Sequence, residues 1–213
     1  AGGLTSEQVL GSRSAQMRGD GFPGLLRRGD CLPFMPSAIE KWPVLAPGTR
    51  GSAPRIAPWW ADGEPLLDLE AHAGLRVIDG SDLHLLQDRR ALYTQTFELT
   101  VGSNRMAAAL HGEPLKIAAS ASLTSEPVVP GTVQLPPDGQ PLILLAEAQT
   151  VGGYARIAHV ASIDLARLAQ RRPGSVIRFE PISIAAAQRL WLWRRERLMR
   201  LRIAALARLQ GKR

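Results

Sequence analysis

The chain has 213 residues, of which 45% are apolar and 21% charged; such a chain buries roughly 70% of its unfolded surface in a core, which excludes wholesale disorder. Its net charge is +7, but nine Lys or Arg and one acid lie in residues 188–213, and 17 basic residues stand against 18 acidic ones before them. The body is therefore nearly neutral and the tail is basic, which argues against a nucleic-acid-binding body and favours a solvated helix face for the tail.

Cysteine usage and hydropathy place the chain in a cellular compartment. The single cysteine, Cys31, excludes an internal disulfide and a metal site built of cysteines. The longest apolar run in the middle of the chain, residues 142–146, is far shorter than the ~20 residues of a membrane helix, and no signal peptide is visible. We expect a cytoplasmic protein without membrane contact.

Residues 1–65 are predicted to contain little regular structure. Residues 1–35 are rich in Gly, Arg and Ser, and residues 28–33 read as a turn that enters a short extended segment. Residues 36–65 hold six prolines and three of the five tryptophans. Because proline lacks an amide donor, this part is predicted to be a linker or a long surface loop.

The next part, residues 66–182, reads as a series of short strands separated by Gly and Pro turns. Strands are predicted at 65–78, 92–101, 132–135, 142–147, 154–163 and 176–182, and short helices at 81–92 and 164–171. Many short strands with few helices predict a mainly β protein with a closed or nearly closed barrel, since closure removes exposed edges.

Residues 183–213 differ from the rest. Apolar side chains recur at helical spacing at 187, 190, 198, 201, 205 and 209, with arginines elsewhere, which predicts an amphipathic terminal helix. Arg194 interrupts the apolar stripe, so we expect the helix to dock only partly.

Several chemistries have no motif in this sequence. There is no Gly-x-x-x-x-Gly-Lys phosphate loop, no Gly-x-Gly-x-x-Gly turn and no Gly-x-Ser-x-Gly elbow. The four histidines, at 72, 84, 111 and 159, lie far apart without ligand spacing, so no metal site is predicted.

The remaining candidates are polar residues near predicted strand ends. Arg105, after Ser103 and Asn104, can hold a carboxylate bidentately or simply pair with a surface acid. Glu126 can accept a hydrogen bond from a lactam or urea N–H, or stabilise the proline-rich turn that follows it. Gln134 and Gln149 each offer a donor and an acceptor suited to an amide.

A second group follows directly in the chain. Thr150 and Tyr154 flank Gly152-Gly153, where the backbone can approach closely and an aromatic with a polar tip follows. A hairpin turn needs the same glycines, so the structural reading stays open beside the functional one.

Ten short segments occur in a recognisable order: Ala1-Gly2-Gly3, Leu10-Gly11-Ser12-Arg13-Ser14, Arg28-Gly29-Asp30, Ser103-Asn104-Arg105-Met106, Ser125-Glu126, Pro130-Gly131-Thr132-Val133-Gln134, Asp138-Gly139-Gln140-Pro141, Gln149-Thr150, Gly152-Gly153-Tyr154 and Arg172-Pro173-Gly174. With them the chain resembles, over nearly its whole length, the allophanate hydrolase subunit 2 family, which also includes the biotin-dependent carboxyltransferases and the C subunits of 5-oxoprolinases.

The resemblance implies cyclophilin-like β-barrels. Residues 66–182 would form one such barrel, residues 1–35 the remnant of a first barrel in a chain that begins late, and residues 183–213 a basic C-terminal helix. Residues 36–65 have no clear counterpart. The family commonly has Asp where Asn104 stands and Gly where Ala107 stands, so a possible charge partner of Arg105 is absent.

The resemblance further implies a subunit of an ATP-dependent complex that opens a small cyclic or urea-like amide, 5-oxoproline first, together with a companion subunit 1. ATP would be used through the complex, and the chain alone would be inactive. Arg105 would hold the substrate carboxylate, Glu126 and Gln134 would read the amide, and the pocket would be lined by Ser103, Asn104, Gln149, Thr150 and Tyr154.

Three alternatives stay open. The first is a carboxyltransferase that uses biotin carried on another chain and a urea-like acceptor. The second is a regulatory partner of a kinase-inhibitor-like subunit. The third and weakest is nucleic-acid binding by the basic tail, which predicts steeply salt-dependent binding.

Overall fold

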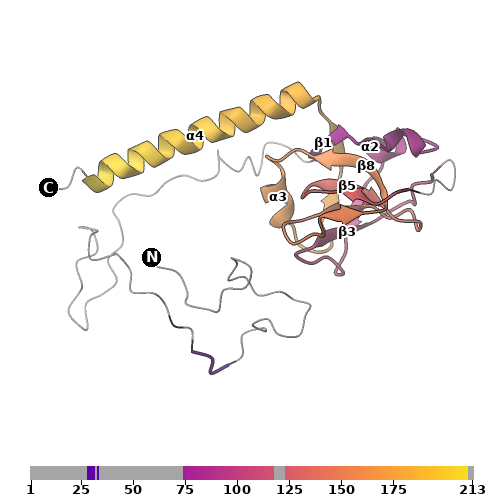
Figure 1. Ribbon diagram of the computed structural model, residues 1–213, viewed down its shortest axis with the longest axis horizontal. Helices are drawn as coiled ribbons and strands as arrows, with labels where there is room; N and C mark the ends of the chain where they lie inside the picture. Colours follow the sequence, from indigo (N-terminus) through magenta and orange to yellow (C-terminus); the bar gives the residue numbers. More distant parts are fainter. Residues whose placement is uncertain (1–27, 32, 34–73, 118–122, 211–213) are drawn as a thin grey trace. The chain divides into compact units, whose positions relative to one another are not determined.

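The computed structural model describes residues 28–31, 33, 74–117 and 123–210 (Figure 1). Most of the expected first-barrel remnant and the whole Pro/Trp-rich segment 36–65 lie outside these residues. The predicted turn at Arg28–Gly29 is confirmed, with Gly29 at a positive φ of 100°. The chain divides into two units, residues 1–60 with 203–213 and residues 61–202; the fold described below belongs to the second.

The second unit is built on an eight-stranded sheet in the order β10-β1-β8-β5-β6-β3-β2-β9. Its strands are β1 (Leu75–Asp79), β2 (Phe97–Leu99), β3 (Ala107–His111), β5 (Thr132–Leu135), β6 (Leu142–Leu144), β8 (Ala155–Val160), β9 (Val176–Ile177) and β10 (Phe179–Pro181). Neighbours are antiparallel except β1 and β10. Because Arg178 alone separates β9 from β10, the two ends of the sheet meet, which confirms the nearly closed barrel.

Smaller elements surround this sheet. A two-stranded ribbon pairs β4 (Glu126–Pro127) with β7 (Val151–Gly152), and the helices are η2 (Leu83–Leu85), α2 (Ala91–Thr94), α3 (Leu165–Ala169) and α4 (Ile184–Gln210). Figure 1 shows α3 beside the strands and α4 as one long continuous helix. None of the described helices is long and apolar enough to span a membrane.

The core of the barrel is aliphatic with two phenylalanines. Val77, Val133 and Ile157 are fully buried, and the Phe97 and Phe179 rings pack 5.6 Å apart. Between β5 and β8 the register shifts, so that Val133 pairs with Ala158 but Gln134 pairs with Arg156, which leaves Ile157 as a bulge.

Most predicted elements are present, several with other bounds. The strand at 132–135 is confirmed to the residue, and β6, β8, α3 and α4 lie within or close to their predicted ranges. The predicted helix 81–92 is wrong as one unit, because it is a short turn at η2 followed by α2. The predicted strand 92–101 is wrong in its first half for the same reason, since α2 continues to Thr94.

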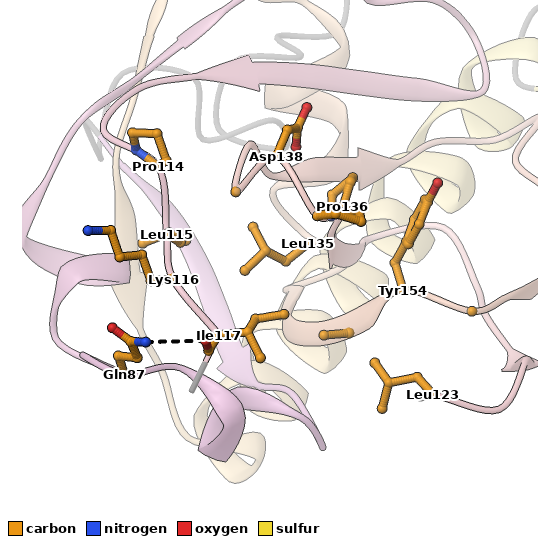
Figure 2. A pocket seen from close by; sticks show the side chains of 14 residues that line it. Gln87, Pro114, Leu115, Lys116, Ile117, Leu123, Leu135, Pro136, Asp138 and Tyr154 are labelled. Carbon is orange, nitrogen blue, oxygen red and sulfur yellow. Dashed lines mark hydrogen bonds between the residues drawn. The ribbon is translucent and has the colours of Figure 1, made fainter. Parts of the chain in front are cut away.

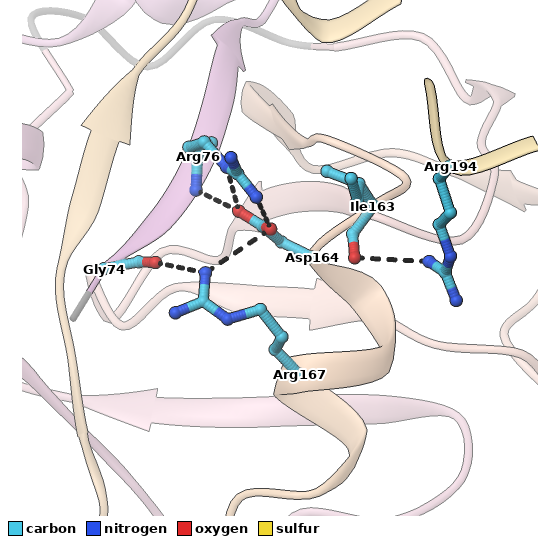
Figure 3. A network of polar contacts seen from close by, with 6 residues as sticks. All are labelled: Gly74, Arg76, Ile163, Asp164, Arg167 and Arg194. Atoms are coloured by element: carbon cyan, nitrogen blue, oxygen red, sulfur yellow. Dashed lines mark hydrogen bonds and ion pairs between the residues drawn. The ribbon is translucent and has the colours of Figure 1, made fainter. Parts of the chain in front are cut away.

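The α4 helix docks in part, as its pattern predicts. Ala187 and Leu190 are half-buried, whereas Trp191, Leu192 and Trp193 are exposed by 46%, 56% and 41%. Arg194 does not interrupt the docking side, contrary to expectation. Its Nη1 donates to the carbonyl oxygen of Ile163 at 3.4 Å, so an arginine supplies one of the contacts between α4 and the body (Figure 3).

A buried ionic cluster joins β1 to the start of α3 (Figure 3). Asp164 is completely buried and accepts from the backbone N–H of Arg76 at 2.8 Å and from its Nε at 2.9 Å. Arg167, 2% exposed, donates to the carbonyl oxygen of Gly74 at 3.1 Å and lies 3.4 Å from Asp164. Since a buried carboxylate needs such partners, this cluster fixes the segment after β8 against β1.

Candidate functional site

The ribbon of β4 and β7 covers Gln134, which is 1% exposed. A Cβ at Gly152 of the ribbon would overlap the side-chain amide of Gln134, so the glycine allows the ribbon to lie directly on this side chain. The Oε1 of Gln134 is 3.5 Å from Nε2 of Gln149, and Nε2 of Gln134 has no hydrogen-bond partner. An amide donor that is buried without a partner is costly, and such a group is typical of a functional site.

Arg156 lies beside Gln134, because the two are register partners on β8 and β5 and therefore share a face of the sheet. Its Nε donates to Asp82 Oδ2 at 3.1 Å, its backbone N–H donates to the same oxygen at 2.9 Å, and Nη1 pairs with Glu126. Arg156 thus connects the ribbon to the segment after β1.

Electrostatics in this cluster keep all three groups charged. The hydrogen bond with Asp82 is the main cause that raises the pKa of Arg156, and the bond with Glu126 adds to it. Burial by itself would raise the pKa of Asp82, but hydrogen bonds from Arg156 outweigh it, so the pKa is lowered.

The residues before β3 form a turn. The side-chain oxygen of Asn104 accepts from the N–H groups of Met106 at 2.8 Å and Ala107 at 3.3 Å, and Ser103 Oγ accepts from the N–H of Ala109 at 3.0 Å. Arg105 forms an ion pair with Glu147, whose N–H donates to the Arg105 carbonyl oxygen at 3.1 Å. Asn104 and Ser103 therefore hold the β2–β3 connection in shape.

Tyr154 lies at a different place, on the wall of a pocket of about 660 Å³ (Figure 2). The pocket is formed mainly by apolar residues of the β3–β4 and β5–β6 connections, among them Pro114, Leu115 and Pro136, with Lys116 and Asp138 as charged groups. In Figure 2 the Tyr154 ring stands opposite the Ile117 side of this pocket.

The predicted site residues thus fall into three groups. Gln134, Gln149 and Glu126 lie around the ribbon, Ser103, Asn104 and Arg105 lie at the β2–β3 turn, and Tyr154 lines the pocket. The β6–β7 connection links the first two groups, because it carries both Glu147 and Gln149. Thr150 lies in it too, and its carbonyl oxygen accepts from Val128 at 2.9 Å.

Sequence reasoning misses Arg156, Asp82 and Glu147 as members of these clusters. The signal for Arg156 is a charged residue inside the apolar stretch 155–163, where a strand facing a neutral environment would not place one. No signal distinguishes Glu147 from an ordinary surface acid. Among the described residues, no group of three or more His, Cys, Asp and Glu side chains is placed to hold a metal ion.

The contact between the ribbon and Gln134 gives a direct test. Gly152→Ala is expected to lower the free energy of unfolding by about 1–3 kcal/mol, because the new methyl group overlaps a buried amide that has no room to move. Urea denaturation measures this loss. Gly153→Ala is the matched control, since its Cβ would meet only the Ser125 hydroxyl, at 3.2 Å, among side chains; equal effects of the two changes would contradict the packing described here.

The chain matches the family model of the carboxyltransferase domain, subdomains A and B, over residues 1–181. It is 34% identical over 194 residues to the C subunit of the 5-oxoprolinase of Haemophilus influenzae, covering 89% of this chain and 56% of that protein. It is 32% identical over 192 residues to the C subunit of the 5-oxoprolinase of Escherichia coli, covering 88% and 56%.

A solved structure agrees in fold. The K. lactis urea amidolyase matches with a TM-score of 0.66 at 23% identity, over 92% of this chain and 12% of that one. The chain spans about half the length of the two relatives named above. With its matched residues, its barrel and these similarities, the chain belongs to the carboxyltransferase family defined by subdomains A and B.

Proposed function

We propose that this chain is part of a subunit of an ATP-dependent 5-oxoprolinase-type complex that acts on a small cyclic or urea-like amide. The observation that carries the proposal is the similarity, over almost nine tenths of the chain, to the C subunits of two 5-oxoprolinases. Because those proteins are named as subunits, we expect a companion subunit and no turnover by this chain alone.

The polar clusters support an amide as the substrate. The unpartnered Nε2 of Gln134 would donate to the amide oxygen once the ribbon admits a ligand, and Glu126, whose side chain is 51% exposed, would accept from the amide N–H. Arg105 would hold the carboxylate of 5-oxoproline in place of Glu147, with Ser103 and Asn104 shaping its turn.

The nucleotide is assigned to the complex rather than to the described residues. The 660 Å³ pocket that Tyr154 lines has one lysine and one aspartate in a mostly apolar wall, which does not fit a triphosphate. ATP would supply a leaving group by phosphorylating the amide oxygen, and the part of this chain that the structure describes would bind and orient the amide.

The test is kinetic and uses the reconstituted complex with 5-oxoproline and ATP. Arg105→Ala is expected to raise KM about tenfold or more, or to abolish turnover, because the substrate carboxylate loses its ion pair. Arg171→Ala, on an exposed residue after α3, is the control and should change neither constant. Wild-type kinetics in the Arg105 variant would remove the assignment of Arg105.

A biotin-dependent carboxyltransferase is the second candidate, favoured by the matched family model and by the fold shared with the K. lactis urea amidolyase. Addition of avidin to the reconstituted activity separates the two. Insensitivity to avidin supports amide opening, and complete inhibition that free biotin prevents supports carboxyl transfer.

A further inference from the structure

Another cavity, of about 300 Å³, lies between the barrel and the first two turns of α4. Ile78 on β1 and His159 on β8 are register partners and share a face of the sheet, and the helix closes over them. The complete lining is Ile78, His159, Ala161, Ser162, Ile184, Ala187, Gln188 and Trp191. We call this cavity the α4 pocket.

The α4 pocket is separate from the clusters described above, since it shares no lining residue with the 660 Å³ pocket and contains none of the predicted site residues. Half of its lining comes from α4, which begins at Ile184, whereas the family match ends at residue 181. The pocket is therefore not a property of the carboxyltransferase subdomains. Its volume is at the lower end of the range for small-molecule sites, about 300–1,000 Å³, so its ligand has one or two rings.

Four side chains of the pocket carry hydrogen-bonding groups. They are the ring nitrogens of His159, the hydroxyl of Ser162, the amide of Gln188 and the indole N–H of Trp191. No hydrogen bond joins any of the four to another residue of the described part of the chain. Ile78, Ala161, Ile184 and Ala187 form the apolar remainder. A few unpartnered polar groups in an apolar wall are the composition of a ligand site.

The charge of the lining selects the ligand class. Burial lowers the pKa of His159, so its imidazole is neutral at pH 7 and offers one donor and one acceptor. Ser162, Gln188 and Trp191 carry no charge, and the neighbouring Arg194 is engaged by the carbonyl oxygen of Ile163. A carboxylate or ammonium group placed among them would lose its hydration without gaining an ion pair, which disfavours charged ligands.

We propose that the α4 pocket binds a small neutral heteroaromatic compound. Its ring stacks on Trp191, and its donor and acceptor atoms pair with His159, Ser162 and Gln188. Aromatic stacking supplies a directional apolar contact, and the polar groups set which edge of the ring faces the sheet.

The probe is nicotinamide, compared with nicotinate, which has the same ring with a carboxylate in place of the carboxamide. Binding to the full chain is measured by ligand-observed NMR titration. We expect saturable binding of nicotinamide with a Kd of about millimolar, as its few atoms allow, and at least tenfold weaker binding of nicotinate. Absence of saturable nicotinamide binding, or equal or tighter binding of nicotinate, overturns the proposal.

Variants locate the site. Ala187→Leu fills the cavity and is expected to weaken nicotinamide binding at least tenfold, whereas Ala185→Leu, on an exposed residue outside the lining, leaves it unchanged. Trp191→Ala and Trp193→Ala form a second pair, since Trp191 alone of the two lines the pocket. If Ala187→Leu disturbs helix docking, the tryptophan pair and Gln188→Leu still decide. Binding that both members of a pair leave unchanged places the ligand elsewhere and contradicts the proposal.

Discussion

Asp164→Asn is expected to lower the free energy of unfolding by about 3–5 kcal/mol, because removal of one partner of a buried ion pair leaves the other charge uncompensated. Asp164 is completely buried and contacts both Arg76 and Arg167, which are themselves 6% and 2% exposed. Arg167 already has two nitrogens, Nε and Nη2, without hydrogen-bond partners. Asparagine keeps the shape of the side chain, so the loss reports the charge.

The same group predicts the response of stability to acid. Burial alone would raise the pKa of Asp164, but the hydrogen bonds and charge of Arg76, with a contribution from Arg167, lower it below its usual value. A carboxyl whose pKa is lower in the folded state stabilises the protein above its unfolded pKa of about 3.9. This contribution is lost as pH falls below about 4 and through the folded pKa.

Urea denaturation of the wild type and of Asp164→Asn, at pH 7 and at decreasing pH below about 4, measures both effects. The difference between the two proteins should shrink as the pH falls, since the wild-type carboxyl then becomes neutral too. Glu196→Gln is the control, because its ion pair with Arg200 on α4 is exposed and such pairs contribute little. A loss below about 1 kcal/mol for Asp164→Asn would show that the cluster does not hold the fold.

The sequence predicts the barrel well where turns and β-branched residues coincide. Thr132–Leu135 lies between the Pro130-Gly131 and Pro136-Pro137 turns, and its bounds follow from them. β3 escapes prediction because Ala107–His111 contains three alanines and no β-branched residue, so burial rather than propensity makes it a strand. The α2 turn has the pattern of a strand because Leu92 alternates with polar neighbours.

The site follows the sequence less closely, since its residues meet through sheet register. Glu126 and Gln134 can be recognised from local composition, but their shared neighbour Arg156 depends on the β5–β8 pairing and its bulge. A shift of one residue there would turn Arg156 to the other face. The place of Arg105 near a strand end indicates a carboxylate ligand but does not reveal Glu147 as its partner.

Gly80→Ala is expected to destabilise the protein by about 3 kcal/mol or more, at or beyond the upper end of overpacking costs. Gly80 follows β1 and donates its N–H to the carbonyl oxygen of Ile157 at 3.1 Å, at the bulge of β8. A Cβ there would lie 2.6 Å from the carbonyl carbon of Ile157 and 2.7 Å from the nitrogen of Ala158. These are backbone atoms of a paired strand, so no side-chain rotation relieves the overlap.

The same substitution should disturb the Arg156 cluster, because Asp82 lies just after Gly80 and accepts hydrogen bonds from both the backbone and the side chain of Arg156. Urea denaturation measures the stability, and the KM and kcat of the reconstituted complex measure the site. Gly102→Ala is the control, since its Cβ would meet only the Thr100 hydroxyl, at 3.5 Å. If Gly80→Ala were as stable as Gly102→Ala, β1 and β8 could not approach as closely as the register of the barrel requires, and the position of Arg156 beside Gln134 would lose its basis.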